Sequence, residues 1–339
     1  MAPGKDQQMS KVGIISNPAS GKDIRRLIAF ASVMDNVEKT NQIKRIVMGI
    51  DSTGVDEILI MPDYYCFGLR VVSDLNSVRL KAKISVLDMP VTATMEDTVN
   101  AAKIMGEMGV GCIVTLGGDG TNRAVAIGSR KTPLVPLSTG TNNVFPIMVE
   151  ATVAGIAAGI TAQNILNGDG FSYIHKRLAI IKDGREIGMA LIDAVVVDQL
   201  FVSSRAVWEL PDVRQIVCTR ADAKNIGLTS VAGVLHPLGA REAKGLHLRI
   251  GDGDLKVRAA VLPGLFADVG VQELQVLDPG DEVQVSLKPS IIALDGEREV
   301  AVQPSDDVKI RIEIDGPPVV EIDKVLSAAA AKGFFKVKN

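Results

Sequence analysis

The sequence predicts an α/β domain with a doubly wound, mostly parallel sheet, followed by an all-β, sandwich-like domain. Two patterns lead to this prediction. Before residue 150, short apolar runs alternate with amphipathic helical segments, an order typical of a parallel sheet with helices on both faces. From about Phe171, apolar residues recur at every second position between Gly and Asp turns, which is typical of antiparallel strands.

The length of the chain agrees with two domains. It has 339 residues, of which 47% are hydrophobic, enough for two cores of ordinary size. We expect a disordered lead at residues 1–10 and an α/β domain that binds nucleotide phosphates at 11–150. A β-sandwich substrate domain is expected at 151–325, and a C-terminal helix or tail at 326–339.

The first half divides into elements by its apolar spacing. We expect a strand in "KVGIIS", a helix in "IRRLIAFASV", and strand ends in "KRIVMGI" and "EILIMPD". Further strands are expected in "KISVLDMP", "GCIVTL" and "TPLVPLS", and a helix in "NRAVAIGS". A further helix is expected in "TMEDTVNAAKIMGEMG". Thr94 and Asp97 have the spacing of a capping box at its start, and Gly109 is expected to end it.

The second half is predicted as hairpins. Two strands join at Lys182-Asp183-Gly184, a turn signal, in "RLAIIKDGREIGMALIDAVVVD". Alternating runs follow in "LHLRIGDGDLKVRAAVL", "DEVQVSLK", "SIIALDGEREVAV" and "VKIRIEID". The last regular segment, "VLSAAAAKG", is expected to be helical.

Composition argues against several kinds of partner. A net charge of −3 and an aromatic content of 4% disfavour a nucleic-acid surface. Three cysteines and three histidines without ligand or disulfide spacing fit a reducing cytoplasm. The run "ATVAGIAAGITAQNIL" is too short for a membrane span and is expected to be a packing helix, and "MAPGKDQQMS" lacks a signal-peptide core. We expect a cytoplasmic protein that binds neither nucleic acid nor membranes.

The segment "TLGGDGT" directly follows a predicted buried strand. Gly117, Gly118 and Gly120 would let backbone N–H groups approach a phosphate, and glycine also permits positive φ. The Thr121 hydroxyl would cap the next helix or touch phosphate. Asp119 is unusual beside a phosphate because a carboxylate repels it. It fits a base for an attacking hydroxyl, an acid beside a cation, or a turn residue that caps the helix.

Three other polar loops also follow predicted strands. Asn17–Lys22 ("NPASGK") offers hydrogen-bond donors and one positive charge, but its glycines do not have the spacing of a P-loop. Leu137–Asn143 ("LSTGTNN") offers hydroxyls and amides that suit a ribose or a base, and equally ordinary Asx and Ser/Thr turns. Leu294–Glu299 ("LDGERE") by itself is a common hairpin turn.

Together the four loops resemble, in this order and across most of the chain, the NAD kinase and diacylglycerol kinase superfamily. Its motifs are an NPxSGK loop, GGDGT after a strand, a GTxN-type loop and a late DGE. The resemblance implies an NAD kinase-like fold, with an N-terminal α/β domain, a C-terminal β-sandwich and an active site between them.

The resemblance also implies roles for residues. ATP phosphates would be bound by Asn17, Ser20, Gly21, Lys22, Gly117, Gly118, Gly120 and Thr121. Asp119 would be the catalytic base or an acid on the metal side. The nucleotide or the second substrate would lie near Thr139, Gly140, Thr141, Asn142, Asn143 and Asp193. Asp295 and Glu297 would face Mg2+, which would bind with the nucleotide rather than in a protein-only site.

Within the superfamily, "NPASGKDIRRL" and "PLSTGTNNVFP" are most similar to NAD kinase-like proteins of the acetoin-catabolism type. NAD kinases hold the dinucleotide with an Ala-Leu-Asn-Glu segment, where this chain has Ala190–Asp193 ("ALID"), with Ile192 in place of the amide. Their Thr-Pro-Thr-Gly-Ser-Thr-Ala-Tyr loop is echoed only loosely by "IGLTSVAG" at Ile226–Gly233.

The sequence therefore predicts an ATP- and Mg2+-dependent phosphotransferase, with the ribose 2′-hydroxyl of NAD as the first acceptor to test. Two alternatives stay open. One is a non-catalytic, nucleotide-binding accessory or sensor protein linked to acetoin catabolism, and the other is a kinase for another small hydroxyl metabolite. The resemblance implies a homodimer or a higher homo-oligomer whose ligands are small nucleotides.

Overall fold

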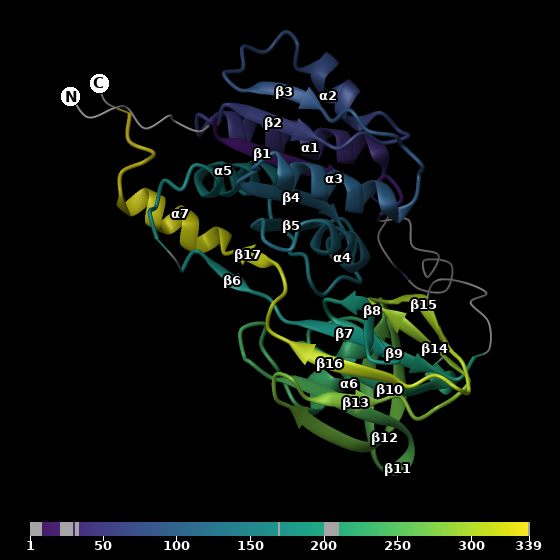
Figure 1. Ribbon diagram of the computed structural model, residues 1–339. Helices are drawn as coiled ribbons and strands as arrows, with labels where there is room; N and C mark the ends of the chain where they lie inside the picture. Colours follow the sequence, from purple (N-terminus) through teal and green to yellow (C-terminus); the bar gives the residue numbers. More distant parts are fainter. Residues whose placement is uncertain (1–8, 21–29, 31–33, 169, 200–209, 338–339) are drawn as a thin grey trace.

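An α/β domain and a domain of antiparallel sheets lie one above the other in the computed structural model (Figure 1). The structure describes residues 9–20, 30, 34–168, 170–199 and 210–337. The two domains confirm the predicted fold class, a mostly parallel α/β sheet followed by antiparallel β-sheets.

The α/β domain is built on a seven-stranded sheet in the order β3-β2-β1-β4-β5-β17-β6. Neighbouring strands are parallel except for β17 and β6. The strands are β1 (Lys11–Ser16), β2 (Glu57–Ile60), β3 (Lys83–Val86), β4 (Cys112–Gly117), β5 (Leu134–Ser138), β6 (Ser172–Ile174) and β17 (Pro318–Val320). The helices are α1 (Asn36–Asp51), α2 (Phe67–Asp74), α3 (Met95–Glu107), α4 (Asp119–Gly128), α5 (Ala151–Ala162) and α7 (Ile322–Ala331).

Successive residues of the central strands point to opposite faces of this sheet. On β1, Ile14 packs in the core that holds α1 and α5, while Ile15 packs in the core that holds α3 and α4. Both faces are therefore covered by helices, which explains why the strands are apolar throughout. Among the described residues, no helix is long and apolar enough to cross a membrane.

The order of the strands fixes where a ligand would bind. The chain runs from β1 through β2 to β3 on one side and from β4 to β5 on the other, so the winding reverses between β1 and β4. Connections leave such a switch point in opposite directions, which opens a crevice at the carboxyl ends of the two strands. Asn17 follows β1 and Gly118 follows β4, so two of the predicted phosphate loops begin there.

The second domain consists of a six-stranded sheet, β12-β11-β10-β9-β14-β15, and a four-stranded sheet, β13-β16-β7-β8. Side chains from both sheets, such as Ile180 and Val196, share one apolar core, as in a β-sandwich. The strands are β7 (Arg177–Lys182), β8 (Arg185–Ala190), β9 (Asp193–Val197), β10 (Val213–Cys218), β11 (Gly245–Leu262), β12 (Leu265–Leu277), β13 (Glu282–Gln284), β14 (Ser290–Leu294), β15 (Glu297–Val302) and β16 (Val308–Glu313). The short η2 turn (Leu210–Asp212) precedes β10, and helix α6 (Leu228–Leu235) packs on the outer face of the larger sheet.

The packing does not follow the boundary expected at residue 150. Helix α5, within the expected sandwich segment 151–325, contributes Ala154 to the same core as Val12 of β1. Strands β6 and β17 extend the first sheet, and Val325 of α7 packs in that core as well. The chain leaves the α/β domain after β6 and returns with β17. Contacts between distant segments decide this arrangement, and the local pattern does not contain them.

One predicted strand is a helix. The segment "KRIVMGI" lies within α1, whose N-cap Asp35 accepts a hydrogen bond from the Glu38 N–H (2.7 Å). The strand prediction is wrong because the apolar residues have helical spacing. Positions i, i+3, i+4 and i+7 are Ile43, Ile46, Val47 and Ile50, all buried on one face.

The predicted capping box of α3 is only half formed. Thr94 is the N-cap and accepts from the Glu96 N–H (3.3 Å). Asp97 accepts instead from the N–H groups of Thr92 and Ala93, both at 2.8 Å, before the cap. Gly109 ends the helix region with φ 72°, as predicted.

Two other expectations fall largely outside the described residues. The helix expected in "IRRLIAFASV" is described only at Phe30. Of the lead expected to be disordered, Met9 and Ser10 are described, and the Ser10 N–H and hydroxyl donate to the Asp56 carboxylate at 2.7 and 2.8 Å.

Helices α1 and α5 cross closely at two glycines. A Cβ on Gly155 would lie 2.3 Å from the Ile46 carbonyl oxygen, and one on Gly49 would lie 2.3 Å from that of Thr152. We expect Gly155→Ala to lower the free energy of unfolding, measured with urea, by about 2 kcal/mol, because backbone atoms cannot yield as a side chain does.

The matched control for this crossing is Gly188→Ala on β8. Its Cβ would meet only a methyl group of Leu294 at 3.6 Å, an ordinary contact. If both variants were as stable as the unmodified protein, the close crossing of the helices would be disproved.

Candidate active site

The loop after β1 is tied to the loop after β4. The Asn17 N–H donates to the Leu116 carbonyl (3.1 Å), and Asn17 Nδ2 donates to Thr121 Oγ1 (3.2 Å). Within the loop, the N–H and the hydroxyl of Ser20 both donate to the Asn17 carbonyl, at 3.2 and 2.7 Å. Ser20 thus closes the turn, while Gly21 and Lys22 lie outside the described residues.

A buried ammonium group lies beneath this turn. Lys39 of α1 donates to the carbonyl oxygens of Asn17 (3.1 Å), Pro18 (3.0 Å) and Ser20 (2.5 Å). One cation therefore holds three carbonyl oxygens of the loop, which fixes the shape of the turn. Lys39 was not predicted, and nothing in the sequence distinguishes it from the other lysines.

Close approach explains the glycines of the "GGDGT" loop. A Cβ on Gly117 would lie 2.4 Å from Thr121 Cβ, and one on Gly118 would lie 2.7 Å from Asn143 Oδ1. A Cβ on Gly120 would lie 3.3 Å from Glu297 Oε1 of the second domain. None of the three glycines has a positive φ, and Gly118 has φ −97°. The conformational freedom that glycine permits is therefore not used here.

The Asp119 carboxylate holds the loop after β5. Oδ1 accepts from the N–H groups of Val144 (3.0 Å) and Phe145 (2.7 Å), while Oδ2 accepts only from Val144, at 3.1 Å. Asp119 is the first residue of α4, and Gly118 is the N-cap, so the carboxylate does not cap the helix. The interpretation of Asp119 as a helix cap is wrong.

The electrostatic surroundings of Asp119 favour a proton. Burial raises the pKa of Asp119 to about 7, and the negative charge of Asp295 acts in the same direction. The N–H groups of Phe145 and Val144 and the cation of Arg220 lower this pKa in part. A carboxyl group whose pKa lies near neutral pH can exchange a proton during catalysis.

Inside the loop after β5, an amide and a hydroxyl fix the turn. Asn143 Nδ2 donates to Ser138 Oγ (2.8 Å), and Ser138 Oγ donates to the Gly140 carbonyl (2.8 Å). The hydroxyl oxygens of Thr139 and Thr141 are buried and have no hydrogen-bond partner in the described part of the chain. The loop thus combines the predicted Ser/Thr turn with two unsatisfied hydroxyl groups.

The late DGE motif supplies a buried carboxylate to "ALID", the connection between β8 and β9. Asp295 is a turn residue with φ 50°. Its carboxylate accepts from the N–H groups of Leu191 (3.0 Å), Ile192 (2.7 Å) and Asp193 (3.3 Å). In return, the Asp193 carbonyl accepts from the Asp295 N–H (2.9 Å). Burial raises the pKa of Asp295, and these donors and a nearby arginine oppose that effect.

That arginine joins α4 to the second domain. Arg123 is 1% exposed, and its guanidinium forms a two-pronged pair with the Glu299 carboxylate, one contact of which measures 2.7 Å. Its Nε lies 3.5 Å from Asp295 Oδ2. The negative partners raise the pKa of Arg123 above its usual value, against the effect of burial. One buried cation is thus shared by two carboxylates.

The structure therefore brings all four motifs to the first turn of α4. Asn17 contacts Thr121, Gly118 approaches Asn143, and Gly120 approaches Glu297.

The sequence analysis missed Arg123, Glu299 and Arg220. A charged residue inside the apolar run "RAVAIG" and an acid in "LDGERE" were signals for the first two. Arg220 follows β10 in a segment without any motif.

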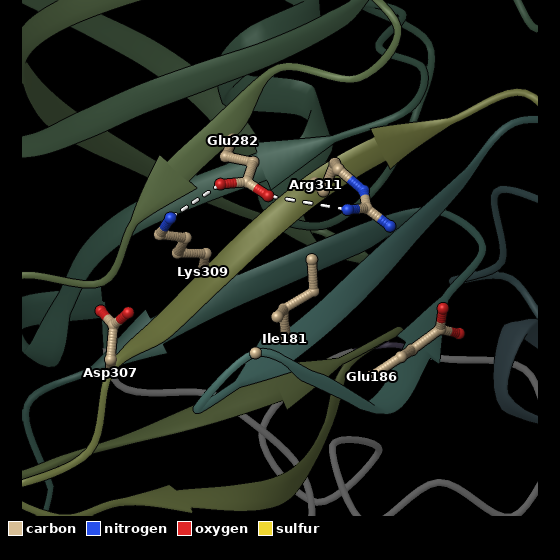
Figure 2. A pocket seen from close by; sticks show the side chains of 7 residues that line it. Ile181, Glu186, Glu282, Asp307, Lys309 and Arg311 are labelled. Carbon is tan, nitrogen blue, oxygen red and sulfur yellow. Dashed lines mark hydrogen bonds and ion pairs between the residues drawn. The ribbon is translucent and has the colours of Figure 1, made fainter.

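A shallow hollow of about 200 Å³ lies elsewhere, on the four-stranded sheet (Figure 2). In it, Glu282 pairs with Lys309 (2.9 Å) and with Arg311 (3.6 Å). The opposite charges there satisfy one another, and none of the predicted site residues lines the hollow. We therefore place the candidate site at the switch point.

Comparison with known families agrees with this arrangement. Residues 65–165 match the model of the ATP-NAD kinase N-terminal domain. This range of the chain includes the loops after β4 and β5. Residues 176–315 match the model of the acetoin catabolism protein X C-terminal domain. This range of the chain includes "ALID" and "LDGE". The first domain is therefore NAD kinase-like, and the second is like that of acetoin catabolism protein X.

Over 325 residues the chain is 39% identical to acetoin catabolism protein X of Cupriavidus necator (strain H16), with 92% of this chain and 90% of the relative covered. The chain belongs to the acetoin catabolism protein X family. Two solved structures of a provisionally assigned diacylglycerol kinase from Bacillus anthracis str. Sterne cover 92% of this chain and 96% and 98% of their own. At 11% identity and TM-scores of 0.41 and 0.42, they carry no argument about the site.

The buried ion network is open to a direct test. Arg123→Met should lower the free energy of unfolding by about 3 kcal/mol near neutral pH, because it leaves two carboxylates without their cation. Urea denaturation measures this loss. The control is Arg258→Met, which removes an exposed pair with Asp268 (2.7 Å) and should leave the unfolding midpoint unchanged. Similar midpoints for the two variants would show that the network does not stabilise the fold.

Proposed function

We propose that this protein is a kinase that uses ATP and Mg2+ to phosphorylate a hydroxyl group of a small metabolite. The observation that carries the proposal is the meeting of four polar loops, distant in sequence, at the first turn of α4. They meet at the switch point of a parallel sheet, where such folds bind ligands. The NAD kinase-like domain supports the class of reaction.

The polar groups of the crevice suit phosphate oxygens. The hydroxyl groups of Ser16, Thr139 and Thr141 are buried and have no hydrogen-bond partner among the described residues. Buried hydroxyls without partners are costly, and phosphate oxygens are acceptors that would satisfy them. Mg2+ would arrive with the nucleotide, with Glu297 and Asp295 as the predicted acids beside it.

In the proposed reaction, ATP supplies the phosphoryl group and Mg2+ offsets the charge of its oxygens. Asp119 accepts the proton of the attacking hydroxyl while the new O–P bond forms and the bond to the ADP oxygen breaks. Oδ1 of Asp119 is held by two N–H groups, whereas Oδ2 has one longer bond and keeps a lone pair for the proton. Positioning and electrostatics supply most of the catalysis of phosphoryl transfer.

NAD is the first acceptor to test, but the pocket departs from that of NAD kinases. Ile192, which stands where those enzymes have an amide, is 1% exposed and packs with Met189 and Leu191 in an apolar core. Its side chain therefore offers a ligand no hydrogen bond. A pocket that lacks such a partner loses about 1–3 kcal/mol of binding, which favours another hydroxyl metabolite as the acceptor.

A second candidate function is a nucleotide sensor without turnover. The observation in its favour is that the Asp119 oxygens already accept hydrogen bonds from Val144 and Phe145. An assay for ADP release with NAD and a panel of small hydroxyl metabolites separates the two functions. Saturable ATP binding without ADP above the control would support the sensor.

The role of Asp119 is tested with Asp119→Asn. The Asn oxygen can replace Oδ1 and keep the bonds to Val144 and Phe145, so the loop should hold its shape. We expect kcat to fall by a factor of about 10²–10⁴, the usual contribution of a positioned base, with ATP affinity nearly unchanged.

The control for this variant is Asp254→Asn, at an exposed carboxylate on β11 far along the chain from the crevice. It should leave kcat as it is. An unchanged kcat in Asp119→Asn would remove Asp119 from the mechanism.

The raised pKa of Asp119 predicts a pH dependence. A base must be unprotonated, so kcat/KM should be low below pH 7, rise through the pKa of about 7, and level off above it. The measurement is kcat/KM against pH, because this ratio reports the pKa of the protein without bound substrate. The residual activity of Asp119→Asn should lack this step, and a step of equal size in that variant would assign the titration to another group.

A further inference from the structure

Arg220 is a charged residue near Asp119 that no motif accounts for. It directly follows β10, where the backbone is fixed on the preceding side. The N–H of Thr219 donates to the Ile192 carbonyl (2.9 Å), and its hydroxyl donates to the Leu191 carbonyl (2.6 Å). On the following side, the Ala221 N–H donates to the Leu238 carbonyl (3.0 Å).

Arg220 lies close enough to Asp119, the proposed base, for their charges to interact. Leu191 and Ile192, which hold Thr219 through their carbonyl oxygens, hold Asp295 through their N–H groups. The charge of Asp295 in turn acts on Asp119, as does the charge of Arg220. Arg220 is therefore anchored where the second domain meets α4.

The Arg220 guanidinium is half-buried and unpaired within the described part of the chain. It has no hydrogen bond there, and no carboxylate oxygen lies within 4.0 Å. An arginine that served only to neutralise Asp119 would lie at ion-pair distance from it. Partial burial of an unpaired charge is costly, so Arg220 needs a partner beyond the described residues.

A second cation, Lys176, lies near Arg220. The buried ammonium of Lys176 donates to the carbonyl oxygens of Gly239 (3.0 Å) and Lys244 (2.9 Å), and no described carboxylate lies at ion-pair distance from it. Beyond Arg220 on the same segment, Asn225 Nδ2 and Thr229 Oγ1 are buried without a hydrogen-bond partner in the described residues.

The segment that carries these groups contacts the first domain. A Cβ on Gly227 would lie 3.5 Å from Asn142 Oδ1 of the loop after β5. The unsatisfied hydroxyl of Thr141 therefore lies on the loop after β5, and that of Thr229 lies in the first turn of α6, whose N-cap Gly227 approaches this loop; Arg220 precedes α6 on the same segment.

We propose that Arg220 binds a phosphate group that the acceptor molecule already carries, apart from the hydroxyl that becomes phosphorylated. The inference rests on the proposed function and narrows its substrate class to phosphorylated hydroxyl compounds. A guanidinium binds two phosphate oxygens at once, and hydroxyl and amide donors suit the others. A neutral polyol would leave Arg220 unpaired and is a poor acceptor.

Titration calorimetry with inorganic pyrophosphate tests the assignment on the full-length chain. We expect binding to the unmodified protein, at least a tenfold weaker affinity in Arg220→Gln, and a smaller loss in Arg220→Lys. The matched control is Arg214→Gln on β10, whose side chain pairs with Asp198 at the surface (2.9 Å). This variant should bind pyrophosphate as the unmodified protein does. Equal affinities in Arg220→Gln and the unmodified protein, or no binding to the latter, would overturn the proposal.

A second titration tests whether Arg220 binds a phosphate of the acceptor or the phosphates of ATP, the phosphoryl donor. With Mg2+ and a non-hydrolysable ATP analogue bound, pyrophosphate should still bind and should still depend on Arg220. If the analogue displaces pyrophosphate and itself binds tenfold more weakly to Arg220→Gln, Arg220 belongs to the ATP phosphates and the proposal fails. ADP release is measured separately, so Arg220-dependent binding of pyrophosphate without ADP release would reject the kinase function and keep the anion site.

Discussion

The geometry of the crevice depends on one buried guanidinium. Arg123 lies one turn after Asp119 on α4 and reaches both Glu299 and Asp295 of the second domain. Asp295 in turn holds the backbone of Leu191 and Ile192. A buried cation is tolerated only when its partners are all in place, so this network fixes the position of the second domain against α4.

Local patterns predicted most of the elements, and long-range contacts decided the rest. The alternation of apolar runs with helical spacing is local, and it correctly gave β4, α4 and β5 on either side of Asp119. The place of α5 is not local. Its small residues Gly155 and Ala158 allow it to lie against α1, so it joins the first domain instead of opening the second. No spacing within α5 itself reveals that partner.

The candidate site was predictable as a set of loops, but not as a set of contacts. Each motif follows a strand, so strand order brings the loops together once the sheet forms. The particular bonds depend on residues that meet only in the fold. Asp119 accepts the N–H groups of Val144 and Phe145, and Gly118 is small because Asn143 lies against it. Arg220 belongs to none of the motifs, and only its position near Asp119 in the folded chain identifies it as a candidate.

The charges around Asp119 also connect recognition with catalysis. In this structure Arg220 lowers the pKa of Asp119, while burial and Asp295 raise it. A phosphate bound to Arg220 would cancel that positive charge and raise the pKa of Asp119 further. The carboxylate would then be a stronger base, but a smaller fraction of it would be unprotonated at neutral pH, and a general base works best when its pKa lies near the working pH. The residue that binds an anionic acceptor would therefore also set the pH range in which the base works, and activity with such an acceptor would rise at a higher pH than the pKa of about 7.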